Sequence, residues 1–309
     1  MAIDEMGLRE QTQPLTDFDL ENFVGAAVSV PEFAPEPSVE RKTSLRRKLL
    51  ALAAVALSAV FPYNDSRATD QIEMVHQHSL PLHGDSLRVM TANVHGWQGH
   101  DGDNVDSLIH ALDQTQPDIA CLQEVFADGD ELRKLYDTGY NVLFITTQNY
   151  FAWGRFGNAV ISPHPLELES AIQLPNPDTD NPRRALVFDM ATERQSLRFA
   201  DVHLSVNYQE SRLQSQVLVS SLRTPLQGIC GDFNQGGDTL MDTQLGTIIP
   251  SYWFRDVRTK PAPYSDRGPI DWVLSTCGRP EDDDKNPVQA DIDSDHFALV
   301  KDINLVTCS

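Results

Sequence analysis

Residues 229–234 read Ile-Cys-Gly-Asp-Phe-Asn, and residues 294–296 read Ser-Asp-His. Alternate residues of a strand share a face, so Asp232 and Asn234 can point into one pocket. Taken alone, the first stretch is also typical of a turn and the second of a helix cap. A carboxylate, an amide and a downstream Asp-His pair are nevertheless the groups that suit hydrolysis of a phosphoester held on a hard metal ion. The stretches therefore direct attention to the other strand ends of the chain.

Five further segments place a polar or ionisable residue within or at the end of an apolar strand pattern. They read Leu-Arg-Val-Met-Thr-Ala-Asn-Val-His-Gly at 87–96, Asp-Ile-Ala-Cys-Leu-Gln-Glu-Val at 118–125, Gly-Asn-Ala-Val-Ile-Ser at 157–162, Phe-Ala-Asp-Val-His-Leu at 199–204 and Pro-Ile-Asp-Trp-Val-Leu at 269–274. Helical patterns lie among them. Val105, Leu108 and Leu112 follow a helical period. A second helix is predicted over 209–222, with Leu213 and Val217 facing inward and Leu218 as a further candidate for that face.

In this order and spacing, the segments resemble the endonuclease/exonuclease/phosphatase superfamily over residues 85–305. The resemblance implies an α+β fold of the DNase I type. This fold is a four-layer α/β/β/α sandwich, in which two mixed sheets pack face to face and helices cover the outside. It also implies an enzyme that hydrolyses phosphoester bonds with the help of a divalent metal ion.

The same resemblance implies a metal site with hard oxygen ligands. Its members would be Asn93, Glu124 and Asp295, and Mg²⁺ is the expected ion because it takes one or two carboxylates and keeps several waters. His95 departs from the pattern, since many relatives carry a carboxylate there. An imidazole suits Mn²⁺ better than Mg²⁺, so Mn²⁺ is the alternative ion, and His95 either binds metal or contacts phosphate.

Catalytic roles are likewise carried over from the matching motifs. Asp232 would orient or deprotonate the attacking water, and Asn234 would donate to the phosphate as charge develops. His296 would contact the scissile phosphate and take part in acid/base chemistry, with Asp271 accepting the other ring N–H of His296. His203 corresponds to the general-acid candidate of the family.

A second set of residues is predicted around these. Asn158 corresponds to a polar position beside the substrate. Arg212 and Gln216 lie four residues apart on the second helix and are expected to pack beneath the site. Arg183, at the start of a strand pattern, faces either phosphate or solvent.

The charge of the chain bears on its substrate. It has 45 acidic and 24 basic residues and a formal net charge of −21. Such a surface repels polyanions at long range, which favours a phosphorylated lipid or small molecule over nucleic acid without excluding the latter. The chain is expected to act as a monomer. The alternative function is a catalytically silent binding module on the same fold.

The N-terminal part differs from the rest and divides into three predicted segments. Residues 1–40 are acidic, contain several prolines and are expected to be disordered. Residues 41–68 combine a basic stretch with the short apolar run 49–61, which predicts an export signal cleaved near Ala68 or a signal anchor associated with the membrane. Residues 69–84 are a linker, and 85–309 form the catalytic domain. Either version places the protein outside the cytoplasm.

The four cysteines show no Cys-x-x-Cys spacing, which argues against a zinc site. Cys121 and Cys230 lie inside apolar strands and are predicted to be buried thiols. Export would allow a disulfide between Cys277 and Cys308, and the sequence leaves open whether the two pair.

Overall fold

The computed structural model describes residues 72–75, 80–99, 104–150, 154–177, 182–236, 270–277 and 288–308. The predicted segments 1–40 and 41–68, with the apolar run 49–61, lie outside the described residues. Among the helices within these ranges, none is long and apolar enough to cross a membrane.

The described strands form two sheets. The first has seven strands in the order β1-β4-β5-β3-β2-β12-β11. Its strands are β1 (Ile72–Val75), β2 (Ser86–Asn93), β3 (Ile119–Phe126), β4 (Asn141–Tyr150), β5 (Gly154–Ser162), β11 (Val288–Ala290) and β12 (Ala298–Asn304). The second has five strands in the order β10-β9-β8-β7-β6. Its strands are β6 (Leu166–Leu174), β7 (Arg183–Ala191), β8 (Ser196–His203), β9 (Gly228–Asp232) and β10 (Asp271–Ser275).

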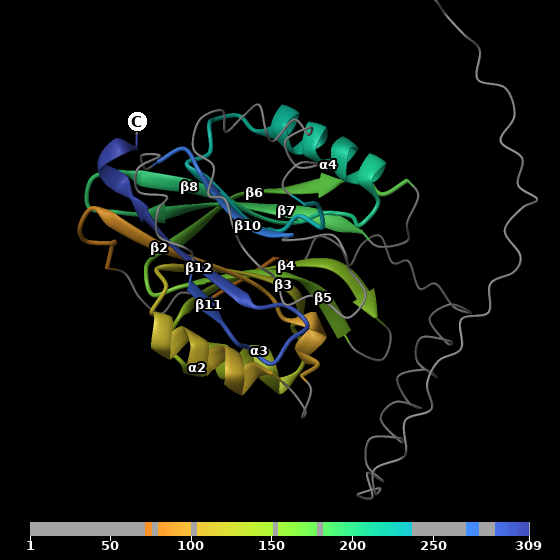
Figure 1. Cartoon of the computed structure of the whole chain (residues 1–309), viewed down its shortest axis with the longest axis horizontal. Helices are drawn as coiled ribbons and strands as arrows, with labels where there is room; N and C mark the ends of the chain where they lie inside the picture. The colour runs from red at the N-terminus through yellow and green to blue at the C-terminus, as the bar shows by residue number, and fades with distance from the viewer. Residues whose placement is uncertain are drawn as a thin grey trace, which may run out of the picture. The chain divides into compact units, whose positions relative to one another are not determined.

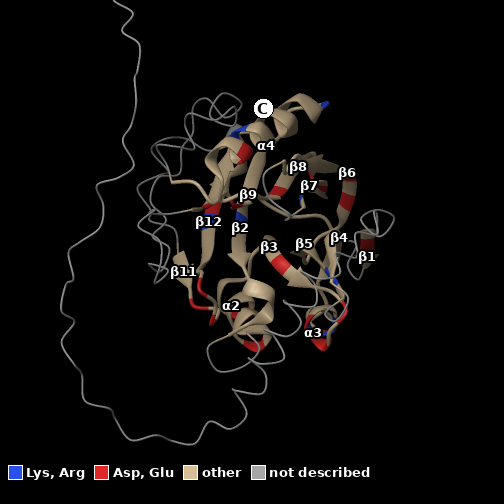
Figure 2. Ribbon diagram, turned by 90° about the vertical axis from the view of Figure 1, so that its right-hand side faces the viewer, with Lys and Arg blue, Asp and Glu red and all other residues tan. Residues whose placement is uncertain are grey.

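Helices cover the outer faces of both sheets, as Figure 1 shows. Helices α2 (Val105–Thr115) and α3 (Asp130–Asp137) pack on the seven-stranded sheet, and α4 (Tyr208–Ser221) packs on the five-stranded sheet. The 3₁₀ turns η2 (His95–Trp97) and η4 (Leu305–Thr307) follow β2 and β12. The view in Figure 2 shows the same layers turned by 90°, with acidic positions at α3 and beside β11. The predicted four-layer sandwich of two mixed sheets is confirmed.

The core between the sheets explains why they pack. Residues of both sheets that alternate along their strands, such as Val89, Val160, Phe188 and Phe199, form one buried cluster. The Phe188 and Phe199 rings are stacked with centroids 6.3 Å apart. Burial of each such side chain contributes about 1.5–3 kcal/mol. The residues between them, such as Leu122 and Val187, are buried on the opposite faces under the helices, so the strands are apolar on both faces.

Helix α4 presents a face to the sheet that differs from the predicted one. The prediction that Leu213 and Val217 face inward is wrong for Leu213, which is 39% exposed. The buried residues are mostly polar, and Gln214 is held by two hydrogen bonds, one from the Ser205 backbone N–H at 2.8 Å and one to the Pro175 carbonyl at 2.9 Å. These polar partners override the apolar pattern and set the rotation of the helix.

The same rotation moves Arg212 and Gln216 to the exposed side of α4. The prediction that they pack beneath the site is therefore wrong. Arg212 instead lies over the ring of Tyr208, with 6.0 Å between the guanidinium carbon and the ring centroid.

Two disulfides connect the described chain. Cys277 and Cys308, whose pairing the sequence left open, form a disulfide. The prediction of two free buried thiols is wrong, because Cys121 of β3 and Cys230 of β9 form a disulfide with their Cα atoms 6.4 Å apart. Both cysteines point into the core between the sheets, so this bond joins the seven-stranded sheet to the five-stranded sheet.

The segment predicted as a linker contributes to the domain. Strand β1 pairs antiparallel with β4, placing Ile72 opposite Ile145, and Leu82 is 6% exposed in the core between the sheets. The described domain thus begins before residue 85.

Candidate active site

The predicted site residues gather where four strands end. Strands β2 and β3 run parallel and neighbour each other in one sheet, as do β8 and β9 in the other. Parallel neighbours bring their carboxyl ends to the same edge of a sheet. Asn93, Glu124, His203 and Asp232 stand at or near these four ends, and hydrogen bonds and close contacts between their side chains join the two sheets there.

The carboxylate of Asp232 is the centre of the cluster. Its Oδ2 accepts a hydrogen bond of 3.0 Å from the Asn93 amide. The Nε2 atoms of His203 and His296 lie 3.5 Å and 3.9 Å from the same oxygen. Its Oδ1 accepts a hydrogen bond of 2.8 Å from the backbone N–H of Asn234. Burial raises the pKa of Asp232 to about 7, and the neighbouring Asp271 carboxylate adds to the rise.

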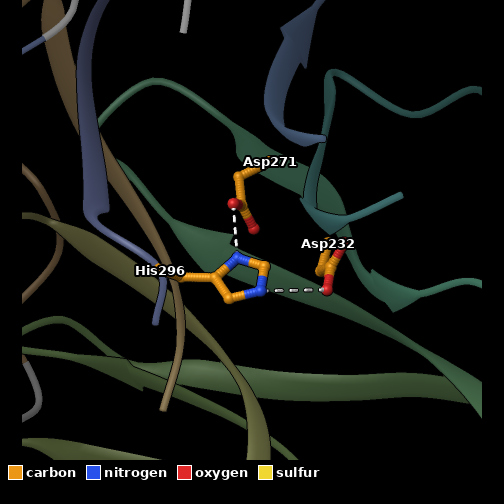
Figure 3. Close-up of side chains that lie close together, drawn as sticks. All are labelled: Asp232, Asp271 and His296. Atoms are coloured by element: carbon orange, nitrogen blue, oxygen red, sulfur yellow. Dashed lines mark hydrogen bonds and ion pairs between the residues drawn. The ribbon is translucent and has the colours of Figure 1, made fainter. Parts of the chain in front are cut away.

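His296 and Asp271 form the predicted pair. The His296 Nδ1 lies 2.7 Å from Asp271 Oδ2, so Nε2 is turned toward Asp232, as Figure 3 shows. Burial lowers the pKa of His296, but attraction to Asp271 and the hydrogen bond that the ring donates to Asp271 outweigh burial and raise that pKa to about 10. The ring is therefore a cation held between two buried carboxyl groups.

His203 has a different partner from His296. Its Nδ1 lies 2.7 Å from an Nη1 atom of Arg183. Burial holds the pKa of His203 well below its usual range, and the positive charges of Arg183 and His296 lower it further. A protonated imidazole, His296, and a neutral one, His203, thus both face the carboxyl group of Asp232.

Arg183 itself joins the site from the start of β7. Burial lowers the pKa of Arg183, while the carboxylates of Glu124 and Asp232 oppose that change. The sequence left open whether this side chain faced phosphate or solvent. In the structure it contacts His203, a contact that depends on pairing between β7 and β8 and has no short-range signal.

Glu124 reaches the site through an irregularity of β3. The pairing of β3 with β5 shifts register between Leu122 and Val125, and Glu124 has a left-handed φ of 60°. In a regular strand Glu124 would point away from the core between the sheets, since Gln123 points into it. Bulges commonly redirect a side chain next to an active site. Here the bulge brings Glu124 Oε1 to 3.1 Å from the Asn93 amide nitrogen.

Left-handed backbone recurs at two more predicted residues. His95 has a φ of 48° and Asn234 a φ of 53°. Such conformations cost of order 1–3 kcal/mol each and cluster at functional sites. Hydrogen bonds hold both turns: the His95 backbone N–H donates to Asn93 Oδ1 at 2.9 Å, and the Asn234 amide donates to the Leu204 carbonyl at 3.0 Å.

The donor set fits a hard divalent ion. The Glu124 and Asp295 side chains are 27% and 38% exposed, which leaves carboxylate oxygens accessible for an ion that keeps several waters. His95 Nδ1 lies 3.4 Å from Asp295 Oδ1, so the imidazole neighbours a predicted metal ligand, and its binding of metal stays a prediction. Glu124, Asp295, His95 and the amide of Asn93 could hold the ion.

A second cluster of side chains that could bind a metal ion exists within the described residues. Side-chain atoms of Asp232, Asp271 and His296 lie within 4.8 Å of one another. The His296 Nδ1 already bonds Asp271, which leaves one ring nitrogen for any other partner. This arrangement suits an acid/base relay.

Beneath the site lies a buried polar layer that the sequence interpretation missed. Asp201, two residues before His203 on β8, is 0% exposed, and its Oδ1 accepts a hydrogen bond of 2.7 Å from Gln123. Burial raises the pKa of Asp201 well above its usual range, and the hydrogen bond from Gln123 opposes that rise. An acidic residue inside an otherwise apolar strand pattern was the sequence signal that could have revealed this buried layer. Asn158 is 2% exposed and lies beside Asp201 in this layer, and its contact with substrate stays a prediction.

Comparison with known proteins agrees with this geometry. Residues 90–296 match the model of the Endonuclease/Exonuclease/phosphatase family. The chain belongs to this family. Family membership places its activity among the phosphoester hydrolases, a class that includes nucleases and phosphatases.

Solved structures show the same fold at low identity. A family protein from Bacteroides thetaiotaomicron has a TM-score of 0.53 at 14% identity, covering 71% of this chain and 97% of its own. A family protein from Leptotrichia buccalis has a TM-score of 0.52 at 18% identity, covering 69% and 98%. TDP2 of D. rerio, complexed with a single-strand DNA product, has a TM-score of 0.50 at 18% identity, covering 71% and 99%. No curated protein matches the chain.

Proposed function

We propose that this chain is a divalent-metal-dependent hydrolase of phosphoester bonds, in which Asp232 activates water and His203 and His296 act on the scissile phosphate. One observation carries the proposal. The Nε2 atoms of both histidines and the amide of Asn93 converge on one buried carboxylate oxygen. Burial of ionisable groups costs stability. Clusters of buried ionisable groups with shifted pKa values are typical of active sites, which supports a catalytic role for this one.

Asp232 is the proposed base. A general base works best when its pKa lies near the working pH, and the pKa of this carboxyl is about 7. The hydrogen bonds from Asn93 and the Asn234 backbone fix its orientation. It can therefore orient a water and take its proton.

The two histidines have separate proposed tasks. His296 is positively charged, and its Nε2–H can donate to a phosphate oxygen or pass a proton to the leaving oxygen, with Asp271 fixing the ring. His203 is neutral and presents an N–H toward the site, because Arg183 donates to its other nitrogen. This assigns the proton-donor role to His296 and a neutral hydrogen-bonding role to His203, which the family resemblance alone had marked as the general acid.

Mg²⁺ or Mn²⁺ would be held by the four predicted metal ligands, Glu124, Asn93, Asp295 and His95. When bound, such an ion supplies charge neutralisation at the phosphate oxygens. The side chain of Asn234 donates to the Leu204 carbonyl, which holds the turn against the end of β8 and keeps the residue at the edge of the phosphate position.

Activity assays test this proposal directly. The purified protein is incubated with bis(p-nitrophenyl) phosphate, plasmid DNA, RNA, phosphomonoesters and phospholipids, with Mg²⁺ or Mn²⁺ and with excess chelator. We expect metal-stimulated cleavage of at least one substrate and its loss with chelator. A folded protein inert toward the whole panel would support the silent binding module instead, and full activity after exhaustive chelation would overturn the metal requirement.

We also propose that the protein is exported. The basic stretch before the apolar run 49–61 supports this, and so do two disulfides, which persist mainly in oxidising compartments. N-terminal sequencing and cell fractionation test the proposal. We expect either a chain beginning near residue 69 or a membrane-bound full-length chain, with the catalytic domain outside in both cases. Recovery of the full-length chain as a soluble cytoplasmic protein would contradict both.

A further inference from the structure

A pocket adjoins the catalytic residues where α4 begins. It has a volume of about 540 Å³ and is lined by residues 206–209 and 234–236. We call it the rim pocket. Its volume lies within the range of roughly 300–1,000 Å³ typical of small-molecule sites. Asn234 belongs both to this wall and to the catalytic cluster, so a ligand in the rim pocket lies next to the position proposed for the phosphate.

Hydrogen bonds hold the walls of the rim pocket in place. The Gln235 amide donates to the Ser205 carbonyl at 3.2 Å, and the Gln235 carbonyl accepts from the Trp272 indole at 3.1 Å. On the opposite wall, the Asn207 side chain accepts from the backbone N–H groups of Gln209 and Glu210 at 2.9 Å and 3.2 Å. A pocket that is already ordered loses little conformational entropy when a ligand binds.

Among the described residues, the lining of the rim pocket contains no Lys, Arg, Asp or Glu. It offers instead an apolar side chain, Val206, which is 53% exposed, and the half-buried aromatic ring of Tyr208. The remaining side chains are amides and a glycine. Aromatic and apolar surface beside amide donors and acceptors is the combination that proteins use to bind an unstacked nucleobase.

We propose that the rim pocket binds the nucleoside part of the substrate, so that the chain acts on a nucleotide-sized phosphoester. The inference rests on the proposed function for the placement of the phosphate. The net charge of −21 agrees with it, because long-range repulsion disfavours an extended polyanion more than a single nucleotide.

Binding measurements test the proposal without requiring turnover. Calorimetry with Mn²⁺ present compares adenosine 5′-monophosphate with ribose 5-phosphate, which lacks the base, and glycerol 3-phosphate, which has the head-group chemistry of a lipid. We expect the nucleotide to bind about tenfold more tightly than either, the scale of one base–aromatic stack. Tyr208→Ala should remove most of that preference, and Val206→Ser should reduce it. The matched control is Leu213→Ala, an exposed residue of the same helix outside the pocket, which should leave the preference unchanged.

Equal affinity for adenosine 5′-monophosphate and ribose 5-phosphate would overturn the proposal. So would glycerol 3-phosphate binding as tightly as the nucleotide, or a preference that survives in Tyr208→Ala. Hydrolysis of bis(p-nitrophenyl) phosphate by the same preparations separates the two proposals. Base-dependent binding without hydrolysis contradicts only the hydrolase, and hydrolysis without base-dependent binding contradicts only the rim pocket.

Discussion

Arg183 donates a hydrogen bond to His203, with 2.7 Å between Nη1 and the ring Nδ1. A guanidinium has no acceptor, so this ring nitrogen must be unprotonated and the hydrogen of the neutral imidazole must reside on Nε2. That atom lies 3.5 Å from Asp232 Oδ2 and 3.8 Å from Glu124 Oε1. The half-buried guanidinium of Arg183 thus decides that His203 presents a donor, and not an acceptor, to the carboxylates of Asp232 and Glu124.

Arg183→Met should therefore impair turnover. We expect kcat to fall about tenfold, which is less than the roughly 10²–10⁴-fold contributed by a group that itself transfers the proton, because Arg183 acts only through His203. Nitrogen NMR of the imidazole should show a single Nε2–H tautomer of His203 in the wild type and a mixture in the variant. Arg194→Met, at a 70% exposed arginine paired with Asp85, is the control and should change neither. An unaltered tautomer in Arg183→Met would contradict the assignment.

Removal of the central groups should have larger effects. Asp232→Ala, His203→Ala and His296→Ala should each lower turnover by about 10²-fold or more, because each removes a positioned proton-transfer or electrostatic group. Steady-state kinetics measure the loss, and circular dichroism checks the fold. Asp113→Asn, an exposed carboxylate of α2, serves as control. Near-normal turnover by a folded His296→Ala protein would rule out the proposed mechanism.

Metal preference should follow the identity of residue 95. If His95 binds the ion, Mn²⁺ should support faster turnover than Mg²⁺, and His95→Asp should reverse that order, since carboxylates favour harder ions. Glu124→Gln should raise the metal concentration for half-maximal activity by about tenfold or more in either background. Titrations with each metal provide the measurement. An unchanged preference in His95→Asp would remove the imidazole from the metal site.

The Cys277–Cys308 bond should stabilise the domain. Its partners are 31 residues apart, for which loop-closure entropy gives a contribution of roughly 3–4 kcal/mol. The double variant Cys277→Ala/Cys308→Ala should lose about that much free energy of unfolding in denaturant titrations without reductant. Mass spectrometry of unreduced peptides should recover the two pairs of the structure. Peptides that show another pairing would contradict both disulfides.

His164 should make stability depend on pH. Its Nε2 lies 3.2 Å from Asp118 Oδ1 and its Nδ1 3.2 Å from the Leu80 carbonyl, so two acceptors favour the doubly protonated ring. The hydrogen bond with Asp118 raises the pKa of His164 in the folded state, although burial opposes it. Because the folded-state pKa is raised, protonated His164 stabilises the protein fully at pH values below the unfolded-state pKa of about 6.5. This contribution disappears as the pH rises through the folded-state pKa.

The expected contribution of protonated His164 to the free energy of unfolding is of order 1 kcal/mol. His164→Gln should therefore unfold at a Tm about 2–4 °C below wild type near pH 5.5 and close to wild type near pH 8.5. His110→Gln, an exposed histidine of α2, should show no such difference. A His164→Gln deficit that grows with rising pH would contradict the sign of the shift.

Local patterns in the sequence predicted the ends of the catalytic strands well, because apolar alternation marks where a strand stops and a polar residue emerges. Asp232, His203 and His296 follow from that pattern together with the family resemblance. Three features depended on distant partners and were missed or wrong. The rotation of α4 depends on two hydrogen bonds of Gln214, which accepts from the Ser205 backbone N–H and donates to the Pro175 carbonyl. The orientation of Glu124 depends on a bulge against β5.

The Cys121–Cys230 bond depends on the packing of two sheets whose cysteines are 109 residues apart. Each cysteine taken singly has the surroundings of an ordinary buried thiol. Only the register of one sheet against the other brings them together, and no periodicity within a strand encodes that register.

That disulfide also limits how the enzyme can adapt to its substrate. Cys121 lies three residues before Glu124 and Cys230 two residues before Asp232, so a covalent tether spans the sandwich close below the metal side and the water-activating side. The separation of those two sides cannot widen by the sheets moving apart. Any adjustment to a larger or smaller substrate must therefore come from the loops above the strand ends. Selectivity in this protein should evolve through loop substitutions, while the spacing of the catalytic groups stays constant.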